Sequence, residues 1–132
     1  MYKRFCKTIL CFLDEIQKVM ENIIFNELKL RGFNVDVGVV EYNYKDSEGK
    51  SQRSKLEVDF IANLGSKKFY IQSAFNIDDE QKKEQETASL NRIDDSFSKI
   101  VVVKDNIEPW QDDKGIQYIG IEQFLLEEDW LR

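Results

Sequence analysis

The sequence predicts a small α/β domain in which a mixed β-sheet is flanked by helices, with the element order α-βββ-α-β-β-α. Three observations lead to this prediction. Apolar residues recur at helical spacing from Thr8 to Arg31, Val and Tyr alternate with polar residues from Phe33 to Tyr44, and residues 100–103 form an unbroken β-branched run. With 132 residues and 42% hydrophobic content the chain can bury one modest core, so we expect a single domain.

The first helix is predicted from a stripe of apolar residues and from a glycine that follows it. The stripe consists of Ile9, Leu13, Ile16, Met20, Ile23, Ile24 and Leu28. These residues lie three or four positions apart, so they share a face that we expect to be buried along its whole length. Gly32 follows as the C-cap of this helix.

The next segment is predicted to form three strands joined by tight turns. Phe33–Tyr44 is the first strand, and the polar residues of Lys45–Lys50 form a turn. The return strand covers about Ser54–Asn63, and a second turn containing Gly65 leads into a third strand over Lys68–Phe75. A meander of three antiparallel strands is the expected result.

A helix crossover then leads to the centre of the sheet. Asn76 and Asp78 supply capping groups for a polar helix that runs to about Arg92. Ser98–Lys104 contains the β-branched run, which is typical of a strand buried on both faces. This strand is therefore expected in the middle of the sheet.

The last quarter of the chain predicts a loop, a short strand and a closing helix. The loop surrounds Pro109 and Trp110, the strand covers Gly115–Ile119 and the helix covers Ile121–Glu128. Trp110 and Trp130 could stack on nucleic-acid bases, but we expect them to anchor the loop and the last helix to the core or to a partner.

Composition excludes several kinds of site. The chain has 25 acidic and 19 basic residues, and its net charge of -6 opposes non-specific attraction to nucleic-acid phosphates. It contains no histidine, which excludes Ser-His-Asp and Cys-His catalysis and imidazole-ligated zinc. Carboxylates remain as the obvious catalytic groups.

The N-terminal residues predict a cytoplasmic protein without a membrane partner. Cys6 and Cys11 lie on different faces of the first helix, so they are not expected to form a bridge and they suit a reducing compartment. The apolar run of residues 9–13 is ended by Asp14 and Glu15, and no small-residue cleavage site follows it. We expect neither a signal peptide nor a membrane span.

Several sequence phrases resemble a known family. These phrases are the stretch from Glu21 to Phe33, Arg31–Gly38, Leu56–Ile61, Phe69–Ala74 and Ser96–Val103. Together with the order of elements, they are similar to the nuclease-like domain at the C-terminal end of a large family of bacterial and archaeal AAA-type ATPases. The resemblance implies a PD-(D/E)XK nuclease-like fold and covers about Met20 to Leu126. The loop Gly-x-x-x-x-Gly-Lys-Ser/Thr is absent, so no ATPase module accompanies it.

The resemblance also suggests domain limits and a site. Residues 1–19 form an N-terminal helical extension, and residues 20–132 form the nuclease-like domain. In active members two strand acids hold a divalent cation, and a lysine two residues after the second acid faces the same phosphate. The helix acid of the family corresponds to Glu21, the strand acids to Asp59 and Gln72, and the lysine to Ala74.

Two of these four positions have lost the chemistry that the family needs. Gln72 keeps an oxygen ligand but no charge, so Glu21, Asp59 and Gln72 are expected to hold Mg²⁺ weakly, or no cofactor at all. Ala74 lacks the cation that stabilises charge on phosphate, an effect worth roughly 10²–10³-fold in rate. A lysine from a neighbouring element, such as Lys99 or Lys104, could replace it.

Each candidate residue also has a structural interpretation. Glu21 could be a solvent-facing helix residue, and Asp59 could be a strand-end acid that bonds a turn amide. Gln72 could be a buried amide that is hydrogen-bonded within the sheet.

Three functions are open at this point. The first is a nuclease-like domain without catalysis that binds or regulates, with DNA, a protein or an ATPase module as its partner. The second is a Mg²⁺-dependent deoxyribonuclease with a variant site made of Glu21, Asp59 and Gln72. The third is a domain that forms a homodimer through its sheet edge or its C-terminal helix with Trp130 and Leu131.

Overall fold

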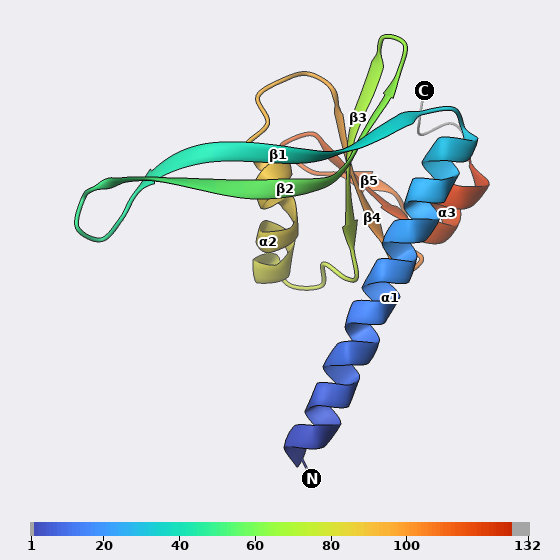
Figure 1. Ribbon diagram of the computed structural model, residues 1–132. Helices are drawn as coiled ribbons and strands as arrows, with labels where there is room; N and C mark the ends of the chain where they lie inside the picture. The colour runs from blue at the N-terminus through green and yellow to red at the C-terminus, as the bar shows by residue number, and fades with distance from the viewer. Residues whose placement is uncertain (1, 128–132) are drawn as a thin grey trace.

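The computed structural model describes residues 2–127, with side chains from residue 11 onward, as a mixed sheet flanked by three helices (Figure 1). The elements in chain order are α1 (Tyr2–Leu30), β1 (Asn34–Lys45), β2 (Ser51–Leu64), β3 (Lys67–Ala74), α2 (Glu80–Asn91), β4 (Ser98–Val103), β5 (Trp110–Gln111), β6 (Ile116–Gly120) and α3 (Ile121–Leu126). The predicted α/β class is confirmed.

The strands form one six-stranded sheet in the order β1-β2-β3-β4-β6-β5. The pairs β1–β2 and β2–β3 are antiparallel, as a meander requires, whereas β4 is parallel to both β3 and β6. The crossover from β3 to β4 runs through α2. The prediction that the β-branched run forms a central strand is confirmed, because β4 is paired on both sides and residues 100–103 are buried.

The predicted element order was wrong in one place, because it omitted β5. Trp110 and Gln111 form a two-residue strand that pairs antiparallel with β6. A strand of two residues shows no alternation in the sequence, and the adjacent Pro109 favours a loop. The Trp110 ring stacks on the buried Tyr118 ring with 4.1 Å between centroids, so its expected anchoring role is confirmed. Trp130 lies outside the described residues.

The sheet buries a separate apolar cluster on each face. On one face α1 and α3 contribute to a cluster of Met20, Ile24, Leu28, Phe33, Phe60, Ala62, Phe69, Ile71, Ile100, Val102, Ile119 and Phe124. On the other face α2 contributes to a cluster of Val58, Tyr70, Ala74, Leu90, Val101, Val103, Ile116 and Tyr118. Ala74 and the neighbouring Ser73 therefore belong to opposite faces of β3, and each is almost completely buried.

The apolar stripe of α1 is buried over only part of its length, contrary to the prediction. Met20, Ile24 and Leu28 are buried, but Leu13 and Ile23 are exposed. Leu13 belongs to the N-terminal half of α1, which extends past the edge of the sheet in Figure 1, whereas Ile23 is turned about 100° around the helix from the buried Ile24. Helical spacing shows which residues share a face but not whether another element covers that face.

The cap of α2 also differs from the prediction. The N-cap is Asp79, whose carboxylate accepts a hydrogen bond from the main-chain N–H of Lys82, in place of Asn76 or Asp78. The three polar residues lie so close together that the sequence does not distinguish their capping roles. Within residues 2–127, no helix has the length and apolar character needed to cross a membrane.

Candidate functional site

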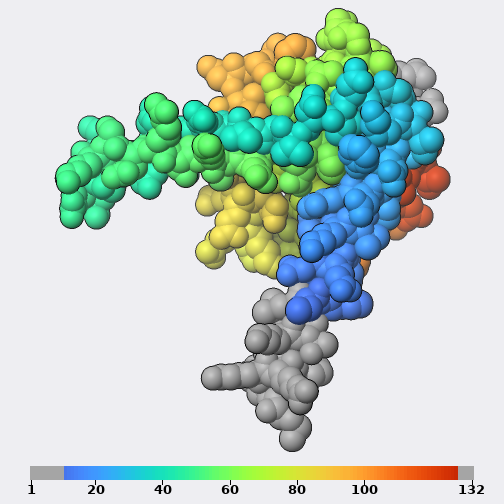
Figure 2. All heavy atoms as spheres, in the orientation of Figure 1, coloured from blue at the N-terminus to red at the C-terminus, as the bar shows by residue number. Residues whose placement is uncertain are grey.

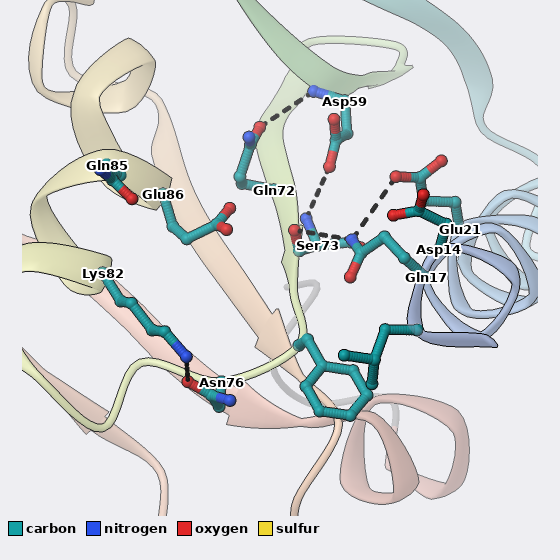
Figure 3. A pocket seen from close by; sticks show the side chains of 12 residues that line it. Asp14, Gln17, Glu21, Asp59, Gln72, Ser73, Asn76, Lys82, Gln85 and Glu86 are labelled. Atoms are coloured by element: carbon teal, nitrogen blue, oxygen red, sulfur yellow. Dashed lines mark hydrogen bonds between the residues drawn. The ribbon is translucent and has the colours of Figure 1, made fainter. Parts of the chain in front are cut away.

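A cavity of about 490 Å³ lies where α1, α2, the middle of β2 and the C-terminal end of β3 meet (Figure 3). It is lined by Leu13, Asp14, Gln17, Glu21, Asp59, Gln72, Ser73, Phe75, Asn76, Lys82, Gln85 and Glu86. The fold thus brings Glu21, Asp59 and Gln72 to one place, while Ala74 is packed in the apolar cluster beside α2.

A β-bulge in β2 sets the position of Asp59. Asp36 of β1 pairs with Ile61, but Gly38 pairs with Val58, so one residue of β1 lies opposite two residues of β2. Asp59 is one of these two residues. A bulge interrupts the alternation of side chains between the two faces and bends the strand. Asp59 therefore turns toward the cavity at the point where the strand changes direction.

Side chains replace the main-chain ladder where β2 and β3 separate. Regular pairing of these strands ends at Phe60 and Ile71. Beyond this pair, the N–H of Asp59 donates to Gln72 Oε1 at 3.0 Å, and the N–H of Ser73 donates to Asp59 Oδ2 at 2.9 Å. We call these two hydrogen bonds the Asp59–Gln72 clip. Gln72 is hydrogen-bonded within the sheet as its structural interpretation expected, but it is half-buried and not buried, and Asp59 bonds an amide of β3 and not a turn amide.

Replacing Gln72 by leucine is expected to lower the free energy of unfolding by about 1 kcal/mol, because the N–H of Asp59 loses its acceptor. Urea denaturation measures the change. Gln85→Leu is the matched control, since Gln85 lines the same cavity but is exposed on α2. Equal stability of the two variants would show that the hydrogen bond from Asp59 to Gln72 contributes nothing.

Gln17 is a central residue of the cavity that the sequence interpretation missed. Its Nε2 donates to Ser73 Oγ at 2.7 Å and lies 3.3 Å from the main-chain oxygen of Ser73 and 3.5 Å from Glu21 Oε1. Gln17 thereby joins α1 to β3 beside the clip. A signal was present, because Gln17 lies four residues before Glu21 and so shares its helix face.

The cavity is electronegative. Four carboxylates line it, from Asp14, Glu21, Asp59 and Glu86, together with one ammonium group from Lys82. Burial raises the pKa of Asp59 to about 6, and the charges of Glu21 and Glu86 add to this effect, although the Ser73 hydrogen bond opposes it. Burial likewise raises the pKa of Glu86, against the attraction of Lys82. The negative charges of Asp59 and Glu86 are therefore held at a cost in free energy.

The two lysines that the sequence offered as replacements for the family lysine, Lys99 and Lys104, do not line the cavity. Lys99 Nζ donates to the main-chain oxygens of Asp95 and Phe97, at the start of β4 and away from the cavity. Lys104 Nζ lies 5.1 Å from the centre of the Phe75 ring, and Lys104 does not line the cavity.

The cation in the cavity comes from α2. Lys82 Nζ donates to Asn76 Oδ1 at 3.2 Å, and both residues line the cavity (Figure 3). The sequence interpretation considered only lysines next to the strand, because the position of a helix relative to a sheet is a tertiary property.

The arrangement does not fit a Mg²⁺ site as it stands. One oxygen each of Asp59 and Gln72 already accepts a main-chain hydrogen bond, and the amide of Gln72 carries no charge. Within the described residues, no three His, Cys, Asp or Glu side chains are grouped closely enough to hold a metal ion. The side chains of Asp59, Gln72 and Gln17 are instead engaged in hydrogen bonds within the protein.

Comparison with known proteins finds one informative similarity. No family model matches the chain, and no solved structure matches it. An uncharacterized protein of Haemophilus influenzae is 35% identical over 108 residues, which are 82% of this chain. The matched part is 23% of that protein, so the chain spans less than a quarter of the length of this relative.

Proposed function

We propose that the chain is a PD-(D/E)XK nuclease-like domain, related to the C-terminal module of AAA-type ATPases, that has lost hydrolysis and acts as a binding or regulatory module. The observation that carries the proposal is the Asp59–Gln72 clip. The two strand positions that hold the cation in active nucleases here hold the strands to each other. The lysine position, Ala74, is part of the core.

The charge of the cavity supports binding of a cationic group over binding of phosphate. With four carboxylates and only one ammonium group, the cavity has an excess of negative charge. This excess repels a phosphodiester when no metal ion neutralises it. The carboxylates attract a lysine or arginine side chain of a protein partner. The positive charge of that side chain would also lower the raised pKa of Asp59. A module that occurs within longer proteins is in keeping with the Haemophilus influenzae relative, of which the matched part is 23%.

One observation favours the alternative function, a Mg²⁺-dependent deoxyribonuclease with a variant site. Lys82 places an ammonium group in the cavity that contains Glu21, Asp59 and Gln72. This group could take the place of the lysine that Ala74 lacks. A single set of experiments separates the two functions.

Calorimetric titration with Mg²⁺ and Mn²⁺ is expected to show no saturable binding at physiological concentrations, because residues 2–127 contain no group of three His, Cys, Asp or Glu side chains that could hold a metal ion. Incubation with duplex, single-stranded and branched DNA in the presence of Mg²⁺ is expected to show no metal-dependent cleavage. Parallel reactions with EDTA identify any cleavage that does not need the metal. Glu57→Ala is the matched control for Asp59→Ala, since Glu57 lies on the same strand and is exposed.

Two results would contradict the proposal. Saturable metal binding that Asp59→Ala abolishes and Glu57→Ala preserves would show a metal site in the cavity. Metal-dependent cleavage that disappears in Asp59→Ala would establish the nuclease, and its loss in Lys82→Ala as well would identify Lys82 as the replacement cation.

A further inference from the structure

Helix α1 carries a second apolar stripe that the sheet does not cover. Phe12 is 61% exposed, Val19 56%, Ile23 38% and Leu30 83%, and Ile16 is half-buried. Within α1 these residues follow spacings of three, four and seven, which is the heptad pattern of a helix that packs against another helix. From Phe12 to Leu30 the stripe is about 27 Å long.

The second stripe is separate from the face that α1 uses in its own fold. Met20, Ile24 and Leu28 face the sheet, and at 3.6 residues per turn they lie roughly 110° around the helix from the exposed stripe. Figure 2 shows the described part of α1 along the outside of the molecule. In the sequence the same spacing continues at Ile9 and Phe5, whose side chains are outside the described part.

The outer border of the stripe is self-complementary in charge. Glu15, Asn22 and Lys29 follow one another at intervals of seven residues along this border, and each is exposed. An acid therefore lies at one end, a base at the other and a neutral amide in the middle. Reversing the direction of such a border converts it into its own complement.

We propose that α1 pairs antiparallel with α1 of a second copy of this chain through the exposed stripe. A two-fold axis at the level of residues 21 and 22 places Glu15 beside the partner's Lys29 and, by symmetry, Lys29 beside the partner's Glu15. The same axis places Leu30 opposite the partner's Phe12 and Ile23 opposite the partner's Val19. Asn26 interrupts the stripe, as a single polar residue does in many paired helices to set the register.

A parallel pair does not use these charges. In a parallel coiled coil the outer border meets the inner border of the partner helix. Glu15 would then face the partner's Met20, a residue that is buried against its own sheet. The antiparallel arrangement forms both ion pairs and is a closed, symmetric contact. It differs from the sheet edge and the C-terminal helix that the sequence suggested for dimerisation.

Sedimentation velocity of the full chain over a wide concentration range tests the pairing. The wild type is expected to be a dimer, and Val19→Glu a monomer, because a charge enters the middle of the stripe. Phe25→Glu is the matched control and is expected to remain a dimer, since Phe25 is 40% exposed on α1 outside the stripe. Circular dichroism checks that each variant is folded.

A charge exchange tests the direction of the helices. Glu15→Lys and Lys29→Glu each place like charges together at both ends, and each is expected to raise the dissociation constant roughly tenfold. The double variant Glu15→Lys/Lys29→Glu restores both pairs and is expected to return to the wild-type value. A monomeric wild type, a dimeric Val19→Glu, or a double variant no tighter than the single ones would overturn the proposal.

Discussion

Replacing Ala74 by lysine is expected to lower the free energy of unfolding by roughly 3–5 kcal/mol, because the ammonium group enters an apolar cluster without a partner. The proposed relationship to the nuclease family would align Ala74 with the lysine of that family, but here the side chain is 0% exposed and packs on the face that α2 covers. The substitution therefore tests whether this fold tolerates a lysine at position 74.

Two measurements separate the charge from the size of the new side chain. Ala74→Met adds an uncharged chain of similar length, for which we expect a loss of about 1–3 kcal/mol from overpacking. Burial lowers the pKa of a lysine, so the penalty of Ala74→Lys should decrease as the pH rises toward its unfolded value of about 10. Equal losses for lysine and methionine at pH 7 would show that the ammonium group reaches water or the carboxylates of the cavity.

The second large effect concerns Asp59 and pH. The free energy of unfolding is expected to fall by about 2 kcal/mol as the pH rises from about 4 to about 6, after allowance for the partial exposure of the carboxyl group. The pKa of Asp59 is raised from 3.8 to about 6, so the folded state binds the proton more tightly than the unfolded state. The stabilisation is complete below the unfolded pKa and is lost as the pH rises through the folded one.

Asp59→Asn should remove most of this pH dependence and make the protein more stable than the wild type at pH 7. The asparagine oxygen can still accept the hydrogen bond from the N–H of Ser73 but carries no charge. Glu41→Gln is the control, because Glu41 is an exposed acid on the neighbouring strand β1 and is not among the groups that raise the pKa of Asp59. Thermal or urea unfolding at several pH values measures both variants. If Asp59→Asn is less stable than the wild type at pH 7, the ionised Asp59 carboxylate does not destabilise the folded state.

Other carboxyl groups act in a different pH range. The pKa values of Asp95 and Asp112 are lowered by hydrogen bonds from Tyr70 and Tyr118 and from nearby main-chain N–H groups, against the effect of burial. The ionised forms of Asp95 and Asp112 therefore stabilise the folded state, and this contribution is lost only as the pH falls below about 3.8. Glu86 has a raised pKa and acts in the same direction as Asp59. Glu86→Gln combined with Asp59→Asn therefore distinguishes the two contributions.

A stabilised Asp59→Asn variant would also bear on function. A carboxylate kept in a desolvated cavity at a cost in stability is typical of sites that bind or react. If the cavity receives a cationic group of a partner, binding should be lost in the same variant that gains stability.

The sequence alone determined the elements and several of their positions. The period of two in β1 and β2, the β-branched run of β4 and the turns that join the meander were enough to predict five of the six strands. Strand periodicity also placed Gln72 and Ala74 on one face of β3. These are local properties, and local spacing encodes them.

Only the tertiary structure decided what those residues do. The bulge that aims Asp59, the clip with Gln72 and the entry of Lys82 from α2 depend on how separate elements meet. The same is true of α1, where two apolar stripes have similar spacing and the position of the sheet selects the one that is buried. Periodicity specifies a face, but contact with another element, which removes water from that face, determines its role.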